Sequence, residues 1–229
     1  MQIQGLQKLT LLDYPGRTAC TIFLSGCNFR CPFCHNAPLL TANAADGMGE
    51  EELLAFLKNR QGLLDGVAVT GGEPLLRPEL PALLEKIKAL GYAVKLDTNG
   101  AFPERLEQIV RAGLADYVAM DVKNSPARYA QTVGAVELDL APIDQSVSFL
   151  LRGTVDYEFR TTAVAELHDD ASFLSLADWL AGARRYFIQR FQPRDTVLRA
   201  GLSAPSEIQL YRWAELVRPK IHAVEIRGI

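Results

Sequence analysis

The sequence predicts an α/β protein in which parallel β-strands are covered by helices. The first observation is that short apolar segments alternate with amphipathic helical patterns along the 229 residues, which is typical of parallel sheets with helical crossovers. The second is that the chemically unusual residues fall where these strands are expected to end. About six repeats fit either a partial (β/α) barrel or an open doubly wound sheet, and both architectures place their sites at the carboxyl ends of the strands.

Six segments carry the pattern of buried strands. Each is enriched in β-branched or aromatic residues, and most end in Gly, Asn, Asp or Pro, which commonly terminate strands. They are residues 19–26, 66–72, 92–100, 116–123, 157–164 and 185–193.

Helical patterns lie between these strands and after the last one. Apolar residues recur at spacings of three and four, which predicts helices with one buried face. Pro103 suits the first position of one helix, and Gly91 suits the end of another. The expected helices cover residues 77–91, 102–113, 143–151, 176–183 and 205–217.

The composition is that of an ordinary globular protein, with 48% apolar and 22% charged residues. No linker-like or low-complexity stretch interrupts the chain, so we expect one domain over residues 1–229. Within it we expect a core of about 17–193 and a C-terminal extension, 194–229, that either closes the barrel edge or docks a partner.

Charge and hydropathy exclude several classes of function. A net charge of −3 gives no basic surplus for binding nucleic acid. No apolar run reaches the roughly 18 residues that span a membrane, and the N-terminal residues lack the apolar region of a signal peptide. We therefore expect a cytoplasmic protein with no membrane association.

The segment CNFRCPFCHN, residues 27–36, contains three of the four cysteines, Cys27, Cys31 and Cys34. In a reducing compartment such clusters indicate metal binding or catalysis more often than disulfides. Structural zinc takes four ligands, and His35 could complete a Cys3His set only through a strained loop, because it adjoins Cys34. Iron–sulfur clusters also take Cys ligands, and three cysteines would leave one iron open for a substrate or cofactor. Cys20 lies in an apolar strand and is interpreted as a core residue.

Further polar motifs follow the next strands. Gly71, Gly72 and Glu73 precede Pro74 at the end of the second strand, and two glycines let a ligand approach the main chain closely. Asp97 and Asp121 end the third and fourth strands, where their carboxylates suit an ammonium group or a cation. Lys123 suits a carboxylate, and Arg160 lies within the fifth strand.

The cysteine triplet together with GGEP resembles the radical S-adenosylmethionine (SAM) superfamily. The resemblance implies a partial (β/α)6 barrel with outer helices. It also implies one [4Fe–4S] cluster held by Cys27, Cys31 and Cys34, with SAM on the fourth iron, which accounts for the missing fourth cysteine.

More narrowly, LLDYPGRTACTIFLSGCNFRCPFCHN, GGEP, LDTNG and MDVK are similar to activating enzymes of glycyl radical enzymes. The similarity is greatest to those of anaerobic ribonucleoside-triphosphate reductase; it runs from about Lys8 to Pro193 and is densest in residues 10–36. It implies an oxidoreductase that cleaves SAM reductively and removes a hydrogen atom from a glycine of a partner enzyme. A flavodoxin- or ferredoxin-like electron donor is implied as well.

The resemblance assigns roles to individual residues. Gly71, Gly72, Glu73 and Asp97 would meet the SAM amino group, and Lys123, beside Asp121, would meet its carboxylate. In some relatives the positions of Asp97, Thr98 and Asp121 suit a monovalent cation. AVAELHDD (163–170) does not match the Gly-rich motif that some members carry after the fifth strand, and Gln192 is only a positional candidate for a later SAM contact.

Three alternatives remain at this stage. The chain could activate another glycyl radical enzyme of the pyruvate formate-lyase type, or act on a small molecule such as a deazapurine precursor. From a different class, it could be a zinc-stabilised α/β binding protein that uses the three cysteines and His35.

Overall fold

The computed structural model of the chain describes residues 1–41 and 47–229. The strands are β1 Gln2–Ile3, β2 Gly5–Thr10, β3 Ala19–Leu24, β4 Met48–Gly49, β5 Gly66–Gly71, β6 Ala93–Thr98, β7 Tyr117–Asp121, β8 Asp156–Ala163, β9 Tyr186–Arg190 and β10 Val224–Arg227. The α-helices are α1 Glu50–Lys58, α2 Leu80–Ala89, α3 Pro103–Arg111, α4 Tyr129–Thr132, α5 Ala141–Leu151, α6 Asp170–Trp179 and α7 Glu207–Val217. Short 3-10 turns occur at Ala37–Leu40, Pro74–Leu76 and Pro126–Arg128.

The central sheet has eight strands in the order β10-β9-β8-β7-β6-β5-β3-β2. Every neighbouring pair from β3 to β10 is parallel, and only β2 runs antiparallel, against β3. Strand order follows the chain without the reversal that defines a doubly wound sheet. The sheet is not closed, so the predicted α/β fold with a partial barrel of parallel strands is confirmed and the doubly wound alternative is excluded.

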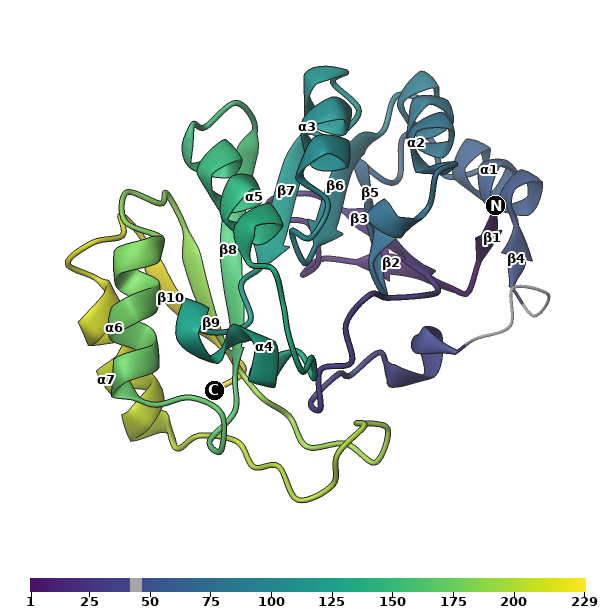
Figure 1. Ribbon diagram of the computed structural model, residues 1–229. Coiled ribbons are helices and arrows are strands. Elements are labelled where there is room, and N and C mark those ends of the chain that lie inside the picture. Colours follow the sequence, from purple (N-terminus) through teal and green to yellow (C-terminus); the bar gives the residue numbers. More distant parts are fainter. Residues whose placement is uncertain (42–46) are drawn as a thin grey trace.

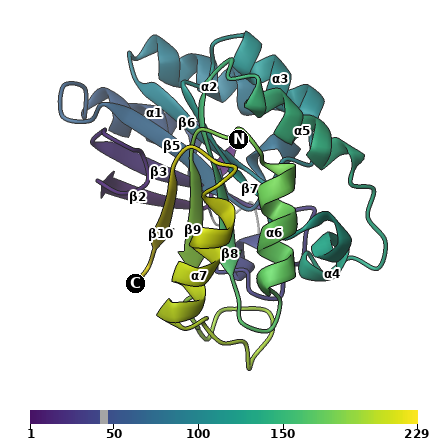
Figure 2. The same ribbon diagram turned by 90° about the vertical axis from the view of Figure 1, so that its left-hand side faces the viewer.

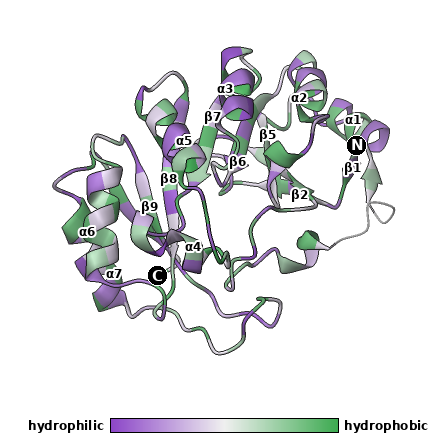
Figure 3. Ribbon diagram, viewed as in Figure 1, coloured by the Kyte–Doolittle hydropathy of each residue, from purple (hydrophilic) through white to green (hydrophobic). Residues whose placement is uncertain are grey.

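The larger helices cover the outer face of the curved sheet, and the strands form its inner layer (Figures 1 and 2). These helices are α2, α3, α5, α6 and α7. Hydrophilic and hydrophobic residues alternate along single helices (Figure 3), and the buried residues of each of these helices are mostly apolar. On α2 the buried residues are Leu80, Leu83, Leu84 and Ile87, the stripe that the sequence predicts. Almost all buried apolar side chains among the described residues join one core cluster. Burial against the sheet therefore explains why these segments form helices.

All six predicted strands are present, as β3, β5, β6, β7, β8 and β9. The sequence did not predict β2, because this edge strand exposes Gln7, Lys8 and Leu9 and lacks a buried apolar run. It also left the role of residues 223–229 open. β10 pairs in parallel with β9, so the C-terminal segment extends the sheet at this edge.

The expected helix at 176–183 is wrong in its bounds. α6 covers Asp170–Trp179, and Leu180 and Ala183 are buried but lie beyond it. The reason is an N-cap that the apolar pattern does not reveal: the Asp169 side chain accepts a hydrogen bond from the Ser172 N–H at 2.8 Å. The helices α1 and α4 were not predicted; α1 buries only Leu53 and Leu57, and α4 has a single turn.

No helix in the described part of the chain is long and apolar enough to cross a membrane.

Candidate functional site

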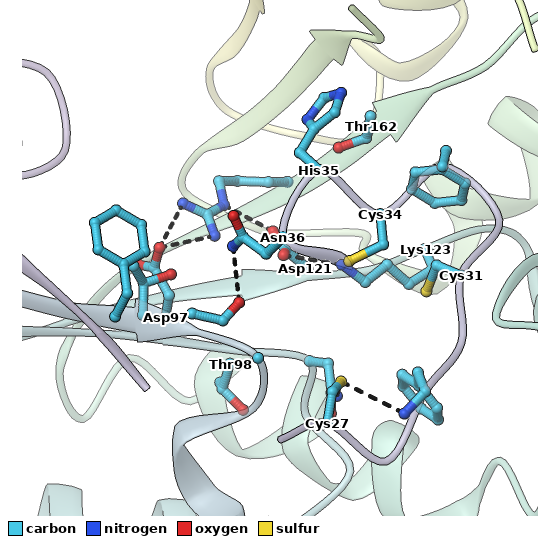
Figure 4. Close-up of a pocket in the computed structure, with 18 of the residues that line it drawn as sticks. Cys27, Cys31, Cys34, His35, Asn36, Asp97, Thr98, Asp121, Lys123 and Thr162 are labelled. Atoms are coloured by element: carbon cyan, nitrogen blue, oxygen red, sulfur yellow. Dashed lines mark hydrogen bonds and ion pairs between the residues drawn. The ribbon is translucent and has the colours of Figure 1, made fainter. Parts of the chain in front are cut away.

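A cavity of about 390 Å³ opens at the carboxyl ends of the parallel strands (Figure 4). Eight of the nine residues predicted for the site line it, and they come from the carboxyl ends of β5, β6 and β7 and from the segments that follow β3, β5 and β7. These residues are Cys27, Cys31, Cys34, Gly71, Gly72, Asp97, Asp121 and Lys123. The ninth, Glu73, is fully buried and lies outside the lining.

The three cysteines lie on the loop that follows β3. Neighbouring segments hold this loop through its backbone: the Arg30 N–H donates to the Val133 carbonyl at 3.0 Å, and the Arg199 N–H donates to the Pro32 carbonyl at 2.9 Å. The Cys27 sulfur accepts a hydrogen bond from the Phe29 N–H at 3.4 Å. Burial raises the pKa of all three thiols, that of Cys31 to about 12. Metal binding would have to displace these protons, since only thiolates ligate metals strongly.

His35 does not join the cysteines. Its ring stacks on Phe191 with centroids 5.4 Å apart, and its Nε2 lies 2.9 Å from the Gln192 carbonyl oxygen. In Figure 4 this ring points away from the sulfur atoms. Among the described residues, no three Cys, His, Asp or Glu side chains converge closely enough to hold a single metal ion. Both observations count against a tetrahedral Cys3His zinc centre.

Gly71 and Gly72 pack directly against the backbone that leads into the cysteine loop. A Cβ at Gly71 would lie 2.3 Å from the Leu24 carbonyl oxygen, and one at Gly72 would lie 1.9 Å from that of Gly26. The N–H groups of Gly72 and Glu73 donate to the Leu24 and Gly26 carbonyls, both at 2.8 Å. The two glycines are therefore required for the contact between β5 and the start of the cysteine loop. Because an ammonium group only donates hydrogen bonds, a ligand of that kind would meet a carbonyl oxygen of this turn.

The buried side chain of Glu73 links the turn after β5 to the end of β6 by hydrogen bonds. Its carboxylate accepts hydrogen bonds from the Leu75 N–H at 3.1 Å, the Thr98 hydroxyl at 2.9 Å and the Asn99 N–H at 2.6 Å. Burial raises the pKa of Glu73 to about 7, although these donors oppose the shift. The Glu73 side chain thus positions the turns after β5 and β6. The predicted contact between Glu73 and the SAM amino group stays a prediction, and it would be made by the backbone of Glu73.

Five charged side chains form a connected set of ion pairs, and we call this set the charge ladder: Lys95, Asp97, Arg160, Asp121 and Lys123. Four of them line the cavity, and the fifth, Lys95, is buried behind Asp97. Lys95 and Arg160 both pair with Asp97, the latter at 3.2 Å. The Arg160 Nε donates to the Asp121 Oδ1 at 2.8 Å, and the Lys123 Nζ donates to the Asp121 Oδ2 at 2.9 Å. The sheet register sets this arrangement, because Asp121 lies directly opposite Arg160 on the neighbouring strand.

The ladder keeps its members charged despite their burial. Burial alone would raise the pKa values of Asp97 and Asp121, but Arg160 together with the lysines outweighs it and lowers both. Burial likewise opposes the charge on Lys123, but Asp121 raises its pKa above the usual value. The ladder therefore carries three cations and two anions.

Several residues of the site were not assigned from the sequence. Lys95 is 2% exposed and belongs to the ladder; its place two residues before Asp97, on the same face of β6, is the pattern that could have revealed it. The Asn36 side chain donates to the Gly71 carbonyl at 2.8 Å, and the Asn99 side chain donates to the Asn28 Oδ1 at 2.8 Å. Only the folded chain brings these segments together.

The sequence matches the family described as the Radical SAM superfamily over residues 21–169. A protein of Methanocaldococcus jannaschii named "Putative glycyl-radical enzyme activating enzyme" is 32% identical over 237 residues, which cover 99% of this chain and 96% of the relative. A 7-carboxy-7-deazaguanine synthase of Hyperthermus butylicus is 37% identical over 118 residues, covering 50% of this chain and 48% of the relative. A pyruvate formate-lyase-activating enzyme of Clostridium pasteurianum is 33% identical over 129 residues, covering 54% and 52%. The chain spans about half the length of these last two relatives.

Solved structures share the fold. A domain of pyruvate-formate lyase-activating enzyme from Bacteroides vulgatus superposes with a TM-score of 0.58 at 20% identity, over 71% of this chain and 99% of that one. SuiB from Streptococcus suis superposes with a TM-score of 0.71 at 12% identity, over 91% of this chain and 48% of that one. At these identities the similarity concerns the architecture alone.

Proposed function

Because the chain belongs to the radical SAM superfamily, we propose that it is an activating enzyme that generates a glycyl radical on a partner enzyme. The partner that we propose is anaerobic ribonucleoside-triphosphate reductase. The observation that carries the activase proposal is similarity over nearly the full length of both chains to the M. jannaschii protein named as such an enzyme. Family membership makes the chain an oxidoreductase that uses a [4Fe–4S] cluster and SAM.

The donor set fits that cluster. Three thiols line one cavity, and the remaining cysteine, Cys20, is fully buried within β3, as predicted. Soft thiolates are the ligands that iron–sulfur clusters take, usually four to a cubane. Three ligands at one cavity therefore suit a cluster with one iron left for SAM, and four residues of the charge ladder line the same cavity.

When bound, the cluster and SAM supply one-electron reductive cleavage of a carbon–sulfur bond and an acceptor for a hydrogen atom. The chain's own residues hold and orient these groups. Cys27, Cys31 and Cys34 would hold the cluster as thiolates, and Lys123 would present a positive charge to the SAM carboxylate. The turn at Gly72, with Asp97, would accept from the SAM amino group. The protein contributes by fixing this geometry and excluding water from the reacting atoms.

The partner must deliver a glycine Cα–H to the cavity. The cavity opens at the strand ends, so a peptide loop from another protein could enter from this side. The electron donor that we propose is flavodoxin- or ferredoxin-like, and the proposed setting is the cytoplasm.

The test is to mix the reconstituted protein anaerobically with the candidate reductase, SAM and dithionite, and to record the electron paramagnetic resonance spectrum. We expect a glycyl radical signal that requires the wild-type cysteines and disappears when the acceptor glycine of the partner is replaced by Ala. SAM cleavage without any radical on the reductase would reject this partner. The same assay with a pyruvate formate-lyase type enzyme would then test the nearest alternative.

A second candidate is a deazaguanine synthase-type reaction on a small molecule. The identity of 37% to the H. butylicus enzyme favours it, although this similarity covers half of the chain. Turnover of a deazapurine precursor by the protein alone, with no partner enzyme, would support it over the activase proposal.

A further inference from the structure

The charge ladder bears on an expectation from the sequence, namely that Asp97, Thr98 and Asp121 suit a monovalent cation beside the SAM carboxylate. A cation of this kind is held by oxygen ligands, and carboxylates that already pair with side-chain cations attract a free ion less strongly. The structure shows what each of these ligands contacts.

All four carboxylate oxygens of the two aspartates already face cationic side chains. Asp97 Oδ1 faces Lys95 and Asp97 Oδ2 faces Arg160 at 3.2 Å. Asp121 Oδ1 accepts from the Arg160 Nε at 2.8 Å, and Asp121 Oδ2 accepts from the Lys123 Nζ at 2.9 Å. Arg160 is thus the one group that bridges both aspartates.

The third expected ligand is engaged as well. The Thr98 hydroxyl donates to Glu73 at 2.9 Å and accepts from the Gly100 N–H at 3.1 Å, and its side chain is buried. One lone pair of this hydroxyl is not used by these two bonds. If the side chain had to rotate to aim that lone pair at a cation, Glu73 would lose one of its donors in a place that water does not reach. Such a loss is costly for a buried carboxylate.

Arg160 is well placed to remain between the aspartates. Its side chain is 12% exposed, and the register of β7 against β8 sets it opposite Asp121. A planar guanidinium can pair with two carboxylates at once and is less strongly hydrated than an ammonium group. Because it belongs to the chain, it bridges the aspartates without the entropy cost of binding a free ion. A mobile cation at the same place would also be repelled by the three fixed positive charges of the ladder.

We propose that the Arg160 guanidinium is a built-in cation that takes the place of a bound Na⁺ or K⁺ in the SAM site of this protein. The site then binds SAM independently of monovalent cations. At the other end of the ladder, Lys123 remains to face the SAM carboxylate. This proposal rests on SAM binding by the family and not on the activase proposal, so it is tested without any partner enzyme.

The first test needs no variant. Reconstituted wild-type protein is titrated with SAM by calorimetry in NaCl, KCl and N-methyl-D-glucamine chloride at equal ionic strength. We expect dissociation constants that agree within about twofold, because no ion enters the site. A wild-type affinity that rises about tenfold in Na⁺ or K⁺ over N-methyl-D-glucamine would overturn the proposal.

The second test removes the built-in cation. Arg160→Met should weaken SAM binding by about tenfold in N-methyl-D-glucamine, because two buried carboxylates lose a partner, and Na⁺ or K⁺ should restore much of the loss. Arg111→Met is the matched control, since Arg111 is exposed and its ion pair is with Glu107, one helical turn away. It removes the same charge and should leave SAM affinity and its cation independence unchanged.

Iron content and circular dichroism decide whether each variant is folded. If folded Arg160→Met loses affinity and neither cation restores any of it, Arg160 does not act as a cation and the proposal fails. If Arg160→Met does not fold, Arg160→Lys decides together with the wild type. Cation-independent SAM binding by Arg160→Lys supports the proposal, and a requirement for Na⁺ or K⁺ in that variant overturns it.

Discussion

Gly72→Ala tests the contact between the strand-end turn and the cysteine loop. A Cβ at this position would lie 1.9 Å from the Gly26 carbonyl oxygen, whereas real Cβ atoms essentially never approach closer than 3.0 Å. The two backbones must therefore separate by more than 1 Å, and this also strains the bond from the Glu73 N–H to the same oxygen, now 2.8 Å long. Overpacking typically costs about 1–3 kcal/mol and a lost backbone hydrogen bond about 1 kcal/mol. We expect the free energy of unfolding to fall by about 2–4 kcal/mol.

The displaced carbonyl immediately precedes Cys27, so the same substitution should reduce iron incorporation. The assay is urea denaturation of the reduced apoprotein, together with iron and sulfide analysis after anaerobic reconstitution. Gly49→Ala is the control, because a Cβ there meets no atom within 4 Å; we expect it to change the free energy of unfolding by less than about 1 kcal/mol. Wild-type stability and full iron content in Gly72→Ala would refute the argument that this turn supports the cysteine loop.

The remaining predictions concern the cluster, the buried glutamate and the charge ladder. Replacing any one cysteine of the triplet by Ala should abolish SAM cleavage and lower iron content, whereas Cys20→Ala should keep its iron; cleavage retained by a triplet variant would remove that residue from the ligand set. Burial raises the pKa of Glu73 in the folded protein to about 7, above its ordinary value near 4.5. The folded state therefore favours the protonated carboxyl, and this contribution to the free energy of unfolding is fully present below about pH 4.5 and is lost as the pH rises through 7. Glu73→Gln should flatten that part of the curve of unfolding free energy against pH, and an unchanged curve would contradict the shift. Lys123→Met should raise the dissociation constant of SAM about tenfold or more while iron content stays near that of the wild type; the reverse pattern would contradict a role at the SAM carboxylate.

The strands were predictable because their residues express one physical requirement, burial on both faces of a parallel sheet. Runs such as VAVTGG, short, rich in β-branched residues and ended by glycines, are typical of strands buried on both faces. Edge strands could not be predicted in this way. β2 is half exposed, so its own residues do not indicate a strand, and it is a strand because it pairs with β3. The start of α6 depended on a single hydrogen bond from Asp169, which apolar spacing does not encode.

The site was predictable to the extent that its residues follow strand ends. Because parallel strands end at one edge, Cys27, Asp97 and Asp121 had to lie near one another. Which atoms they contact was not predictable from spacing. Arg160 was visible within a strand, but its bridge between two aspartates depends on the register of three strands. The orientation of His35 toward Gln192 likewise follows from a loop 157 residues away.

The most direct test of the central claim is to reconstitute the protein anaerobically with iron and sulfide, add dithionite and SAM, and assay for 5′-deoxyadenosine. The account predicts that 5′-deoxyadenosine forms only with reductant and that the three cysteine-to-alanine variants do not produce it. A protein that holds zinc and leaves SAM intact would contradict the account, because the three cysteines would then be structural ligands.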